Sequence, residues 1–206
     1  MFDVLPYGDR AALVECGTTH PARLADLLRQ SVSWEGHPSV QMIPGARTVL
    51  IESTGALDRG RLEEAIRSAL PSLDSDDPAE GEIVEVPVHY DGPDLDAVAA
   101  EVGTGVGDII EAHTSALHIV DFCGFAPGFA YMSGLPEWLH LDRLEQPRTR
   151  VPAGSVAIAA GWSAVYPGES PGGWRLLGRT DLRVFDPTRE SPALLTPGSR
   201  VRFRPA

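Results

Sequence analysis

The 206-residue sequence contains no lysine and no asparagine, and it has only two cysteines, Cys16 and Cys123. Without lysine the chain cannot form a Schiff base, and it cannot carry the nucleotide-binding loop whose lysine contacts the β- and γ-phosphates. Two cysteines are too few for a disulfide framework or a cysteine-rich zinc site. Contacts to phosphate or carboxylate groups must therefore come from arginine, hydroxyl groups or backbone N–H groups.

Long hydrophobic runs are also missing, so the sequence predicts no membrane span. The first ten residues, MFDVLPYGDR, lack the basic and apolar parts of a secretion signal, and we expect a cytoplasmic protein. The net charge of −12 argues against a nucleic-acid partner. Residues 68–142 contain no arginine, whereas 143–206 contain ten. This basic last third is compatible with an anionic ligand, an acidic partner or ordinary surface arginines.

Residues 1–80 predict a small α/β sandwich, and the chain as a whole is predicted to be of the α+β class. Segments typical of strands, at 2–5, 10–16, 39–43 and 47–52, surround a helix over 18–32 and precede a second helix over 58–70. The segment 71–82, PSLDSDDPAEGE, is rich in proline, serine and acidic residues, and we interpret it as a linker.

Residues 81–206 predict a mostly β domain. A strand at 83–90 alternates apolar and polar residues, and Pro87 favours an edge position for it. Two short helices follow, the first capped by Asp94 and ended by Gly103. Ten glycines and ten prolines then separate short apolar segments between 121 and 206, which favours a barrel or sandwich. These segments lie at 155–160, 163–166, 174–178, 181–186 and 200–204.

The segment GFAPGFAY, 124–131, places large aromatic side chains on a backbone of turn residues. Pro127 and Gly128 predict a rigid loop. We expect either Phe125 or Phe129 to fill the core, and the other, with Tyr131, to face a ligand or partner. A second loop at 166–180 is similar in composition. Its candidate ligand- or partner-facing residues are Tyr166, Ser170, Gly172, Gly173, Trp174, Arg179 and Thr180.

Three further residues are candidates for chemistry. Arg148 and Arg150, in QPRTRVP, are two apart on an extended segment and would point the same way. They fit a carboxylate or phosphate clamp, or else they pair with acids of the 68–142 segment. His113 ends a short helix, where a charged imidazole is favoured, although a hydrogen-bonded structural histidine is the more common case in such a setting. The G-x-S-x-G match at 168–172 is not a nucleophile elbow, because Pro171 has no N–H. No spacing of ligands predicts a metal site.

The motifs GFAPGFAYMSGL, PRTRVPAGSVAIA and YPGESPGGWRLLGRT, in this order, resemble the B subunit of bacterial ATP-dependent 5-oxoprolinase. This family has also been called allophanate hydrolase subunit 1, and one branch is known as a sporulation-kinase inhibitor. The resemblance extends to YGDRAALVECG near the start of the chain and to VPVHYDGPDLDAVA. The family usually has Pro-Arg where this chain has Asp142-Arg143, so we carry no role onto Arg143.

The resemblance implies a cyclophilin-like barrel after a small α/β sandwich. It implies a component of an enzyme that is incomplete alone and opens 5-oxo-L-proline to L-glutamate together with the C and A subunits of the same enzyme. ATP with Mg²⁺ would bind at a site shared with the C subunit, with Arg148, Arg150 and Arg179 as candidate cations. The alternatives are an inhibitor of a sensor histidine kinase, or a component of a urea- or allophanate-type enzyme. A prolyl isomerase would rest on barrel analogy alone.

Overall fold

The structure is a computed structural model that describes residues 2–31, 40–69, 71 and 82–206. The chain folds into two compact units, Met1–Glu80 and Gly81–Ala206. The predicted linker, 71–82, lies outside the described residues except at its two terminal positions. Within the described ranges, no helix has both the length and the apolar character needed to span a bilayer.

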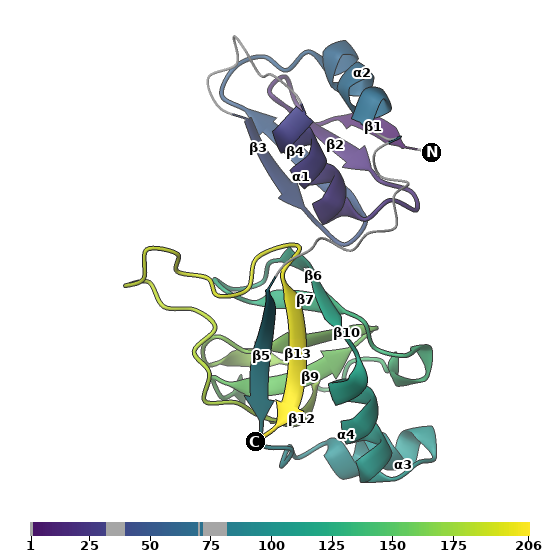
Figure 1. Cartoon of the computed structure of the whole chain (residues 1–206), viewed down its shortest axis with the longest axis vertical. Coiled ribbons are helices and arrows are strands. Elements are labelled where there is room, and N and C mark those ends of the chain that lie inside the picture. The colour runs from purple at the N-terminus through teal and green to yellow at the C-terminus, as the bar shows by residue number, and fades with distance from the viewer. Residues whose placement is uncertain (1, 32–39, 70, 72–81) are drawn as a thin grey trace. The chain divides into compact units, whose positions relative to one another are not determined.

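The first unit is an antiparallel four-stranded sheet with two helices on one face (Figure 1). Its elements are β1 (Asp3–Pro6), β2 (Ala11–Glu15), α1 (Pro21–Ser31), β3 (Val40–Pro44), β4 (Thr48–Ser53) and α2 (Arg59–Ala69). The strand order is β1-β2-β4-β3. Leu24 and Leu28 of α1 and Leu62 and Ile66 of α2 pack against Ile51 of the sheet. Helices and strands therefore occur in the order that the sequence pattern predicts.

The second unit is a nearly closed barrel with two helices. Its elements are β5 (Ile83–Val88), α3 (Leu95–Val102), α4 (Val106–Ser115), β6 (His118–Cys123), β7 (Ala130–Ser133), a 3-10 turn η2 (Glu137–Leu139), β8 (Arg148–Val151), β9 (Ser155–Ala159), β10 (Trp162–Val165), β11 (Ser170–Gly172), β12 (Arg175–Arg179) and β13 (Arg200–Pro205). Seven strands form one sheet, in the order β12-β9-β10-β7-β6-β13-β5.

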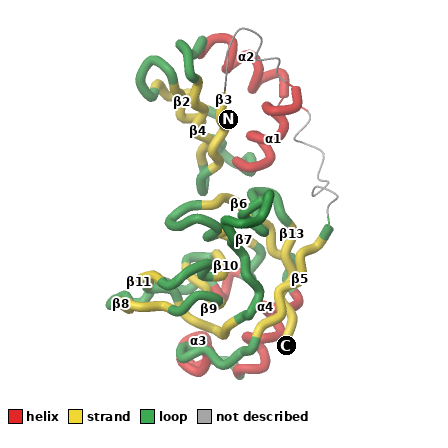
Figure 2. Tube along the Cα trace, turned by 90° about the vertical axis from the view of Figure 1, so that its left-hand side faces the viewer, coloured by secondary structure: helices red, strands yellow, loops and turns green. Residues whose placement is uncertain are grey.

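The two ends of this sheet meet. His89, just after β5, exchanges two backbone hydrogen bonds with Arg179 at the end of β12, with N–O distances of 2.8 and 2.9 Å. Along the barrel strands, alternate side chains point to opposite faces. Val86, Val120, Val156 and others form the enclosed core, whereas α3 and α4 lie together beside one end of the barrel (Figures 1 and 2). The α+β class with a barrel domain is thereby confirmed.

Two local predictions are wrong. The segment 181–186 is not a strand: only an isolated bridge joins Phe185 to Ala193, because Leu182 donates its N–H to the hydroxyl of Thr180. Asp94 precedes α3 but does not cap it, since its side chain makes no capping hydrogen bond. The end of α3 is as predicted, because Gly103 adopts a left-handed conformation with φ of 74°.

Candidate functional site

The loop between β6 and β7 contains the GFAPGFAY segment. Phe125 has φ of 67°, and Ala126 donates its N–H to the carbonyl oxygen of Gly124 at 2.8 Å. This is a γ-turn with positive φ, a strained conformation for a residue with a side chain. The ring of Phe125 is 62% exposed. A large apolar side chain is thus presented to solvent at a strained backbone position.

The neighbouring phenylalanine points the other way. Phe129 is buried and makes edge-to-face contacts with Tyr166 and Trp174, at ring centroid distances of 5.1 and 5.5 Å. Gly128, with φ of 80°, lets the loop close on Phe185, because a Cβ at position 128 would lie 2.5 Å from the Cβ of that residue. The choice that the sequence leaves open is therefore resolved: Phe129 is buried and Phe125 is exposed.

Phe129 does not fill the enclosed core of the barrel. It belongs to a second cluster with Ala157 and Ala159, which alternate along β9 with the core residue Val156. This cluster consequently lies on the outer face of the sheet. We call its ring-bearing members and their contacts the outer aromatic cluster: Phe122, Phe125, Phe129, Tyr131, Trp162, Tyr166 and Trp174.

The two-stranded ribbon of β8 and β11 lies beside the main sheet (Figure 2). Ser170 and Gly172 of β11 pair with Val151 and Arg148 of β8. At Gly172 a Cβ would overlap the hydroxyl group of Tyr166, so this position requires glycine for close packing. Because a strand spans 170–172, the serine is not followed by the helix that a nucleophile elbow needs.

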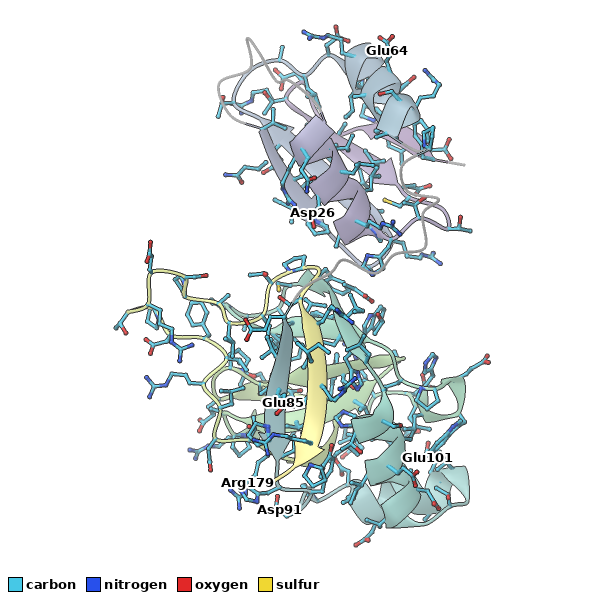
Figure 3. All side chains as sticks on the ribbon, viewed as in Figure 1. Asp26, Glu64, Glu85, Asp91, Glu101 and Arg179 are labelled. Carbon is cyan, nitrogen blue, oxygen red and sulfur yellow. The ribbon has the colours of Figure 1, made fainter. Side chains whose placement is uncertain are left out.

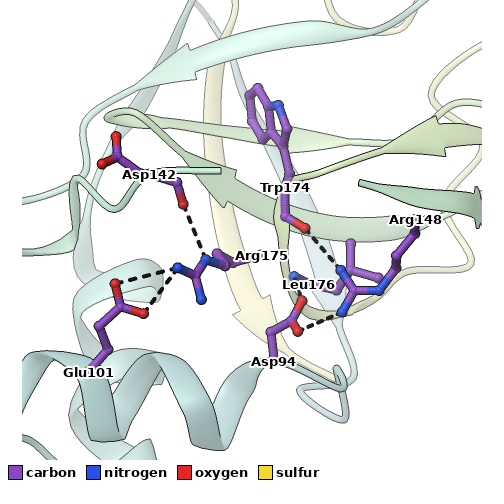
Figure 4. A network of polar contacts seen from close by, with 7 residues as sticks. All are labelled: Asp94, Glu101, Asp142, Arg148, Trp174, Arg175 and Leu176. Atoms are coloured by element: carbon purple, nitrogen blue, oxygen red, sulfur yellow. Dashed lines mark hydrogen bonds and ion pairs between the residues drawn. The ribbon is translucent and has the colours of Figure 1, made fainter. Parts of the chain in front are cut away.

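Arg148 is bound within the barrel unit. Its Nη2 lies 2.6 Å from Oδ1 of Asp94, and Asp94 Oδ2 accepts the N–H of Leu176 at 2.7 Å (Figure 4). The side chains of Arg148 and Asp94 are only 28% and 10% exposed. Asp94 therefore connects the start of α3 to β8 and β12. Of the two interpretations that the sequence allows for Arg148, a ligand clamp or a pair with an acid of the 68–142 segment, the structure shows the pair.

Arg150 and Arg179 also have carboxylate partners. Arg150 lies 2.6 Å from Glu169, and Arg179 lies 3.0 Å from Asp91, next to which it is labelled in Figure 3. Both pairs are more than half exposed, so each guanidinium is open to solvent. The hydroxyl of Thr180, in contrast, accepts the N–H of Leu182 inside the fold. The predicted arginines thus share no common focus in this chain.

Arg143, to which the sequence assigned no role, is exposed, and its neighbour Leu144 is hydrogen-bonded to Gly173, which precedes Trp174 of the outer aromatic cluster. Burial raises the pKa of both Tyr131 and Tyr166, and the positive charge of Arg143 acts against that rise at each phenol. Within the described residues no ion pair involves Arg143. The Pro-Arg pattern that the resemblance supplies was the signal that could have identified this residue.

His113 lies in the interior. Its Nδ1 is 2.7 Å from the hydroxyl of Tyr90, and its Nε2 is 3.1 Å from the hydroxyl of Ser163. Burial holds the pKa of His113 well below its ordinary value, with a smaller contribution from His118. The charged form that the helix end would favour is thus disfavoured by desolvation. Since both ring nitrogens have partners and the ring is fully buried, we assign His113 a structural role.

Among the described residues there is no group of three or more His, Cys, Asp or Glu side chains that could hold a metal ion. An open hollow of about 520 Å³ occurs in the first unit, lined by residues that include Tyr7, Arg10 and Glu52. None of its lining residues belongs to the predicted site. Its lining combines acidic and basic side chains without a common chemical preference, and we give more weight to the outer aromatic cluster.

Residues 2–195 match the family model described as carboxyltransferase domain, subdomain C and D, and the chain belongs to this family. It is 49% identical over 129 residues to the 5-oxoprolinase B subunit of Escherichia coli O157:H7, covering 61% of this chain and 59% of that protein. It is 42% identical over 124 residues to the 5-oxoprolinase B subunit of Bacillus subtilis, covering 59% of this chain and 52% of that protein. The chain therefore spans between half and two thirds of the length of these curated relatives.

Solved structures show the same fold. The structure of TTHA0988 superposes with a TM-score of 0.79 at 35% identity, over 96% of this chain and 40% of that one. The urea amidolyase of Kluyveromyces lactis superposes with a TM-score of 0.72 at 23% identity, over 100% of this chain and 15% of that one. The second likeness concerns the fold alone.

Proposed function

We propose that this chain is the B subunit of an ATP-dependent 5-oxoprolinase, which converts 5-oxo-L-proline to L-glutamate together with its C and A subunits. The observation that carries the proposal is the 42–49% identity to three proteins named as 5-oxoprolinase B subunits. On this chain, the segments that carry the resemblance contribute Phe129, Tyr131, Tyr166 and Trp174 to one cluster on the outer face of the barrel. We place substrate contact where this cluster remains open to solvent, at exposed Phe125 and half-buried Tyr131.

The chemistry explains why such a surface is useful. A five-membered lactam is a stable amide, and phosphorylation of its carbonyl oxygen by ATP would create a good leaving group and an electrophilic carbon. Addition of water to this carbon and cleavage of its bond to the ring nitrogen would give an amine and an acyl phosphate, and a second water would hydrolyse the acyl phosphate to a carboxylate and inorganic phosphate. The substrate is a small flat ring with a negative charge. An aromatic surface with a nearby arginine can hold such a ring and keep bulk water from it.

ATP and Mg²⁺ do not fit this chain alone. The sequence has no lysine for a phosphate-binding loop, and the described part of the chain has no group of three potential metal-binding side chains. We therefore propose that the nucleotide binds at a site completed by the C subunit. Arg150 and Arg179 are candidates for that shared site because both are exposed, whereas Arg148 is held by the largely buried Asp94.

The C subunit would also need a surface to bind. On the face of the first sheet that points away from α1 and α2, Leu5, Leu13, Leu50 and Ile43 are neighbours in register across all four strands. Leu5 and Ile43 are 41% and 44% exposed. A contiguous apolar row of this kind is typical of a protein interface. We propose that the C subunit docks on it.

The docking proposal is tested by co-purification with a tagged C subunit. The double variant Leu5→Ser/Ile43→Ser is expected to retain much less of this partner than the wild type. Tyr7→Ser is the control, because Tyr7 is 61% exposed but lies outside the row. Equal retention by the double variant and the wild type would show that the partner binds elsewhere.

The function is tested by co-expressing this chain with the C and A subunits and measuring ATP hydrolysis and glutamate release. We expect both to depend on 5-oxoproline and on the presence of this chain. Urea and allophanate belong in the same substrate panel, because turnover of either instead of 5-oxoproline would favour the urea-type alternative. If no substrate is turned over and the chain blocks autophosphorylation of a purified sensor histidine kinase, the regulatory alternative replaces the proposal.

A further inference from the structure

Arg143 is positioned by hydrogen bonds on both sides of it. The carbonyl oxygen of Asp142 accepts a hydrogen bond from Nε of Arg175 at 3.2 Å. Leu144 donates its N–H to the carbonyl oxygen of Gly173 at 2.7 Å. The backbone at Arg143 therefore runs alongside residues 173–175, and Trp174 of the outer aromatic cluster lies between the two anchoring points.

Arg143 differs from the other arginines near the outer aromatic cluster in having no carboxylate partner among the described residues. Arg148, Arg150 and Arg175 lie within 3.1 Å of a carboxylate oxygen of Asp94, Glu169 and Glu101, respectively. Among the described residues, Arg143 has no such partner, and its side chain is exposed. The hydrogen bond from Leu144 to Gly173 holds Arg143 beside Trp174 of the outer aromatic cluster, and in keeping with that position its positive charge opposes the rise in the pKa of Tyr131 and Tyr166. A positive charge next to an aromatic surface is left without a counterion from this part of the chain.

We infer that Arg143 binds the carboxylate of the small cyclic amide substrate, while the members of the outer aromatic cluster that remain open to solvent, exposed Phe125 and half-buried Tyr131, contact its flat ring. A guanidinium group offers paired N–H donors that match a carboxylate. Phe125, exposed at its strained turn and in edge contact with Phe129 at 5.3 Å, supplies an apolar wall. The choice of ligand rests on the proposed function. Arg143 is then a substrate-binding residue that recognises the part of the molecule not involved in ring opening.

The test uses the reconstituted complex of this chain with the C and A subunits. Arg143→Gln is expected to raise KM for 5-oxoproline about 10- to 100-fold, the loss typical of a hydrogen bond between charged groups. The inhibition constant of pyrrolidin-2-one, which has the same ring but no carboxylate, is expected to stay unchanged. Arg143→Lys should restore part of the affinity. Arg202→Gln on β13 is the control, because it removes the same charge from an exposed position in register with Glu85.

Four other outcomes would overturn either the assignment of Arg143 or the proposed function. An unchanged KM for 5-oxoproline in Arg143→Gln overturns the assignment of Arg143 and leaves the proposed function standing. A parallel loss of affinity for pyrrolidin-2-one shows that the carboxylate is not what Arg143 recognises. If KM rises for ATP alone, Arg143 contacts the nucleotide and the inference is wrong. Absence of 5-oxoproline turnover in the wild-type complex overturns the proposed function, and the assignment falls with it.

Discussion

Asp94 is predicted to be a key structural carboxylate of the barrel unit. In Asp94→Ala, the buried N–H of Leu176 loses its acceptor, which costs about 1–3 kcal/mol. Arg148 loses its carboxylate as well, and since its side chain is 28% exposed, we expect a further loss of about 1 kcal/mol, well below that of a fully buried pair. The free energy of unfolding should therefore fall by roughly 2–4 kcal/mol.

The matched control is Glu169→Ala. It removes the partner of Arg150 from a pair whose side chains are 75% and 52% exposed, so the expected change is under about 0.5 kcal/mol. Asp94→Asn should fall between the two, because an amide oxygen can still accept one hydrogen bond. Urea unfolding followed by tryptophan fluorescence reports mainly on this unit, since three of the four tryptophans, Trp138, Trp162 and Trp174, lie in it. If Asp94→Ala and Glu169→Ala lower the free energy equally, the role of Asp94 is refuted.

Two further predictions concern the barrel unit. Burial lowers the pKa of both His113 and His118, so only the unfolded chain takes up protons as the pH falls through about 6.5. Stability is complete above that pH and should decline below it, by at most about 1.4 kcal/mol per pH unit for each histidine until its folded pKa is reached. Urea midpoints at pH 7.5 and 5.5 measure this, and equal midpoints would contradict it. Gly172→Ala should lower the melting temperature, because the added Cβ would force Tyr166 to move. Gly168→Ala should not, because a Cβ at position 168 would have no atom within 4 Å. Thermal unfolding compares the two variants, and equal melting temperatures would count against the close packing at Gly172.

Local patterns in the sequence predict most of the fold correctly. Helical periodicity and strand alternation identify the two helices and four strands of the first unit, and glycine identifies the end of α3. The strand prediction for 181–186 is wrong although apolar and polar residues alternate there. The end of this segment forms a turn, in which Asp186 accepts a hydrogen bond from the N–H of Thr188. A pattern of apolar residues does not reveal whether a segment finds a neighbouring strand.

The candidate site is less predictable because its contacts join residues far apart in the chain. Asp94 has the sequence position of a helix cap, yet its carboxylate binds groups that lie more than 50 positions away. The competition between a local cap and a distant arginine depends on the tertiary fold. Likewise, no local rule shows that Arg148 has a carboxylate partner and that Arg143 has none within the described ranges, because that depends on which acidic side chains the barrel brings near each of them.

The backbone at Phe125 gives an independent reason to place function at this loop. Apart from glycines, Phe125 and Ala160 are the described residues with positive φ. Ala160 and Gly161 form the two-residue turn between β9 and β10, where positive φ at both positions is the geometry that a tight hairpin needs. At Phe125 a glycine would adopt the same backbone without steric cost. Phenylalanine adds one edge contact with Phe129 but leaves most of its ring exposed, and an exposed ring held at a strained position is best explained by a contact with a ligand or partner.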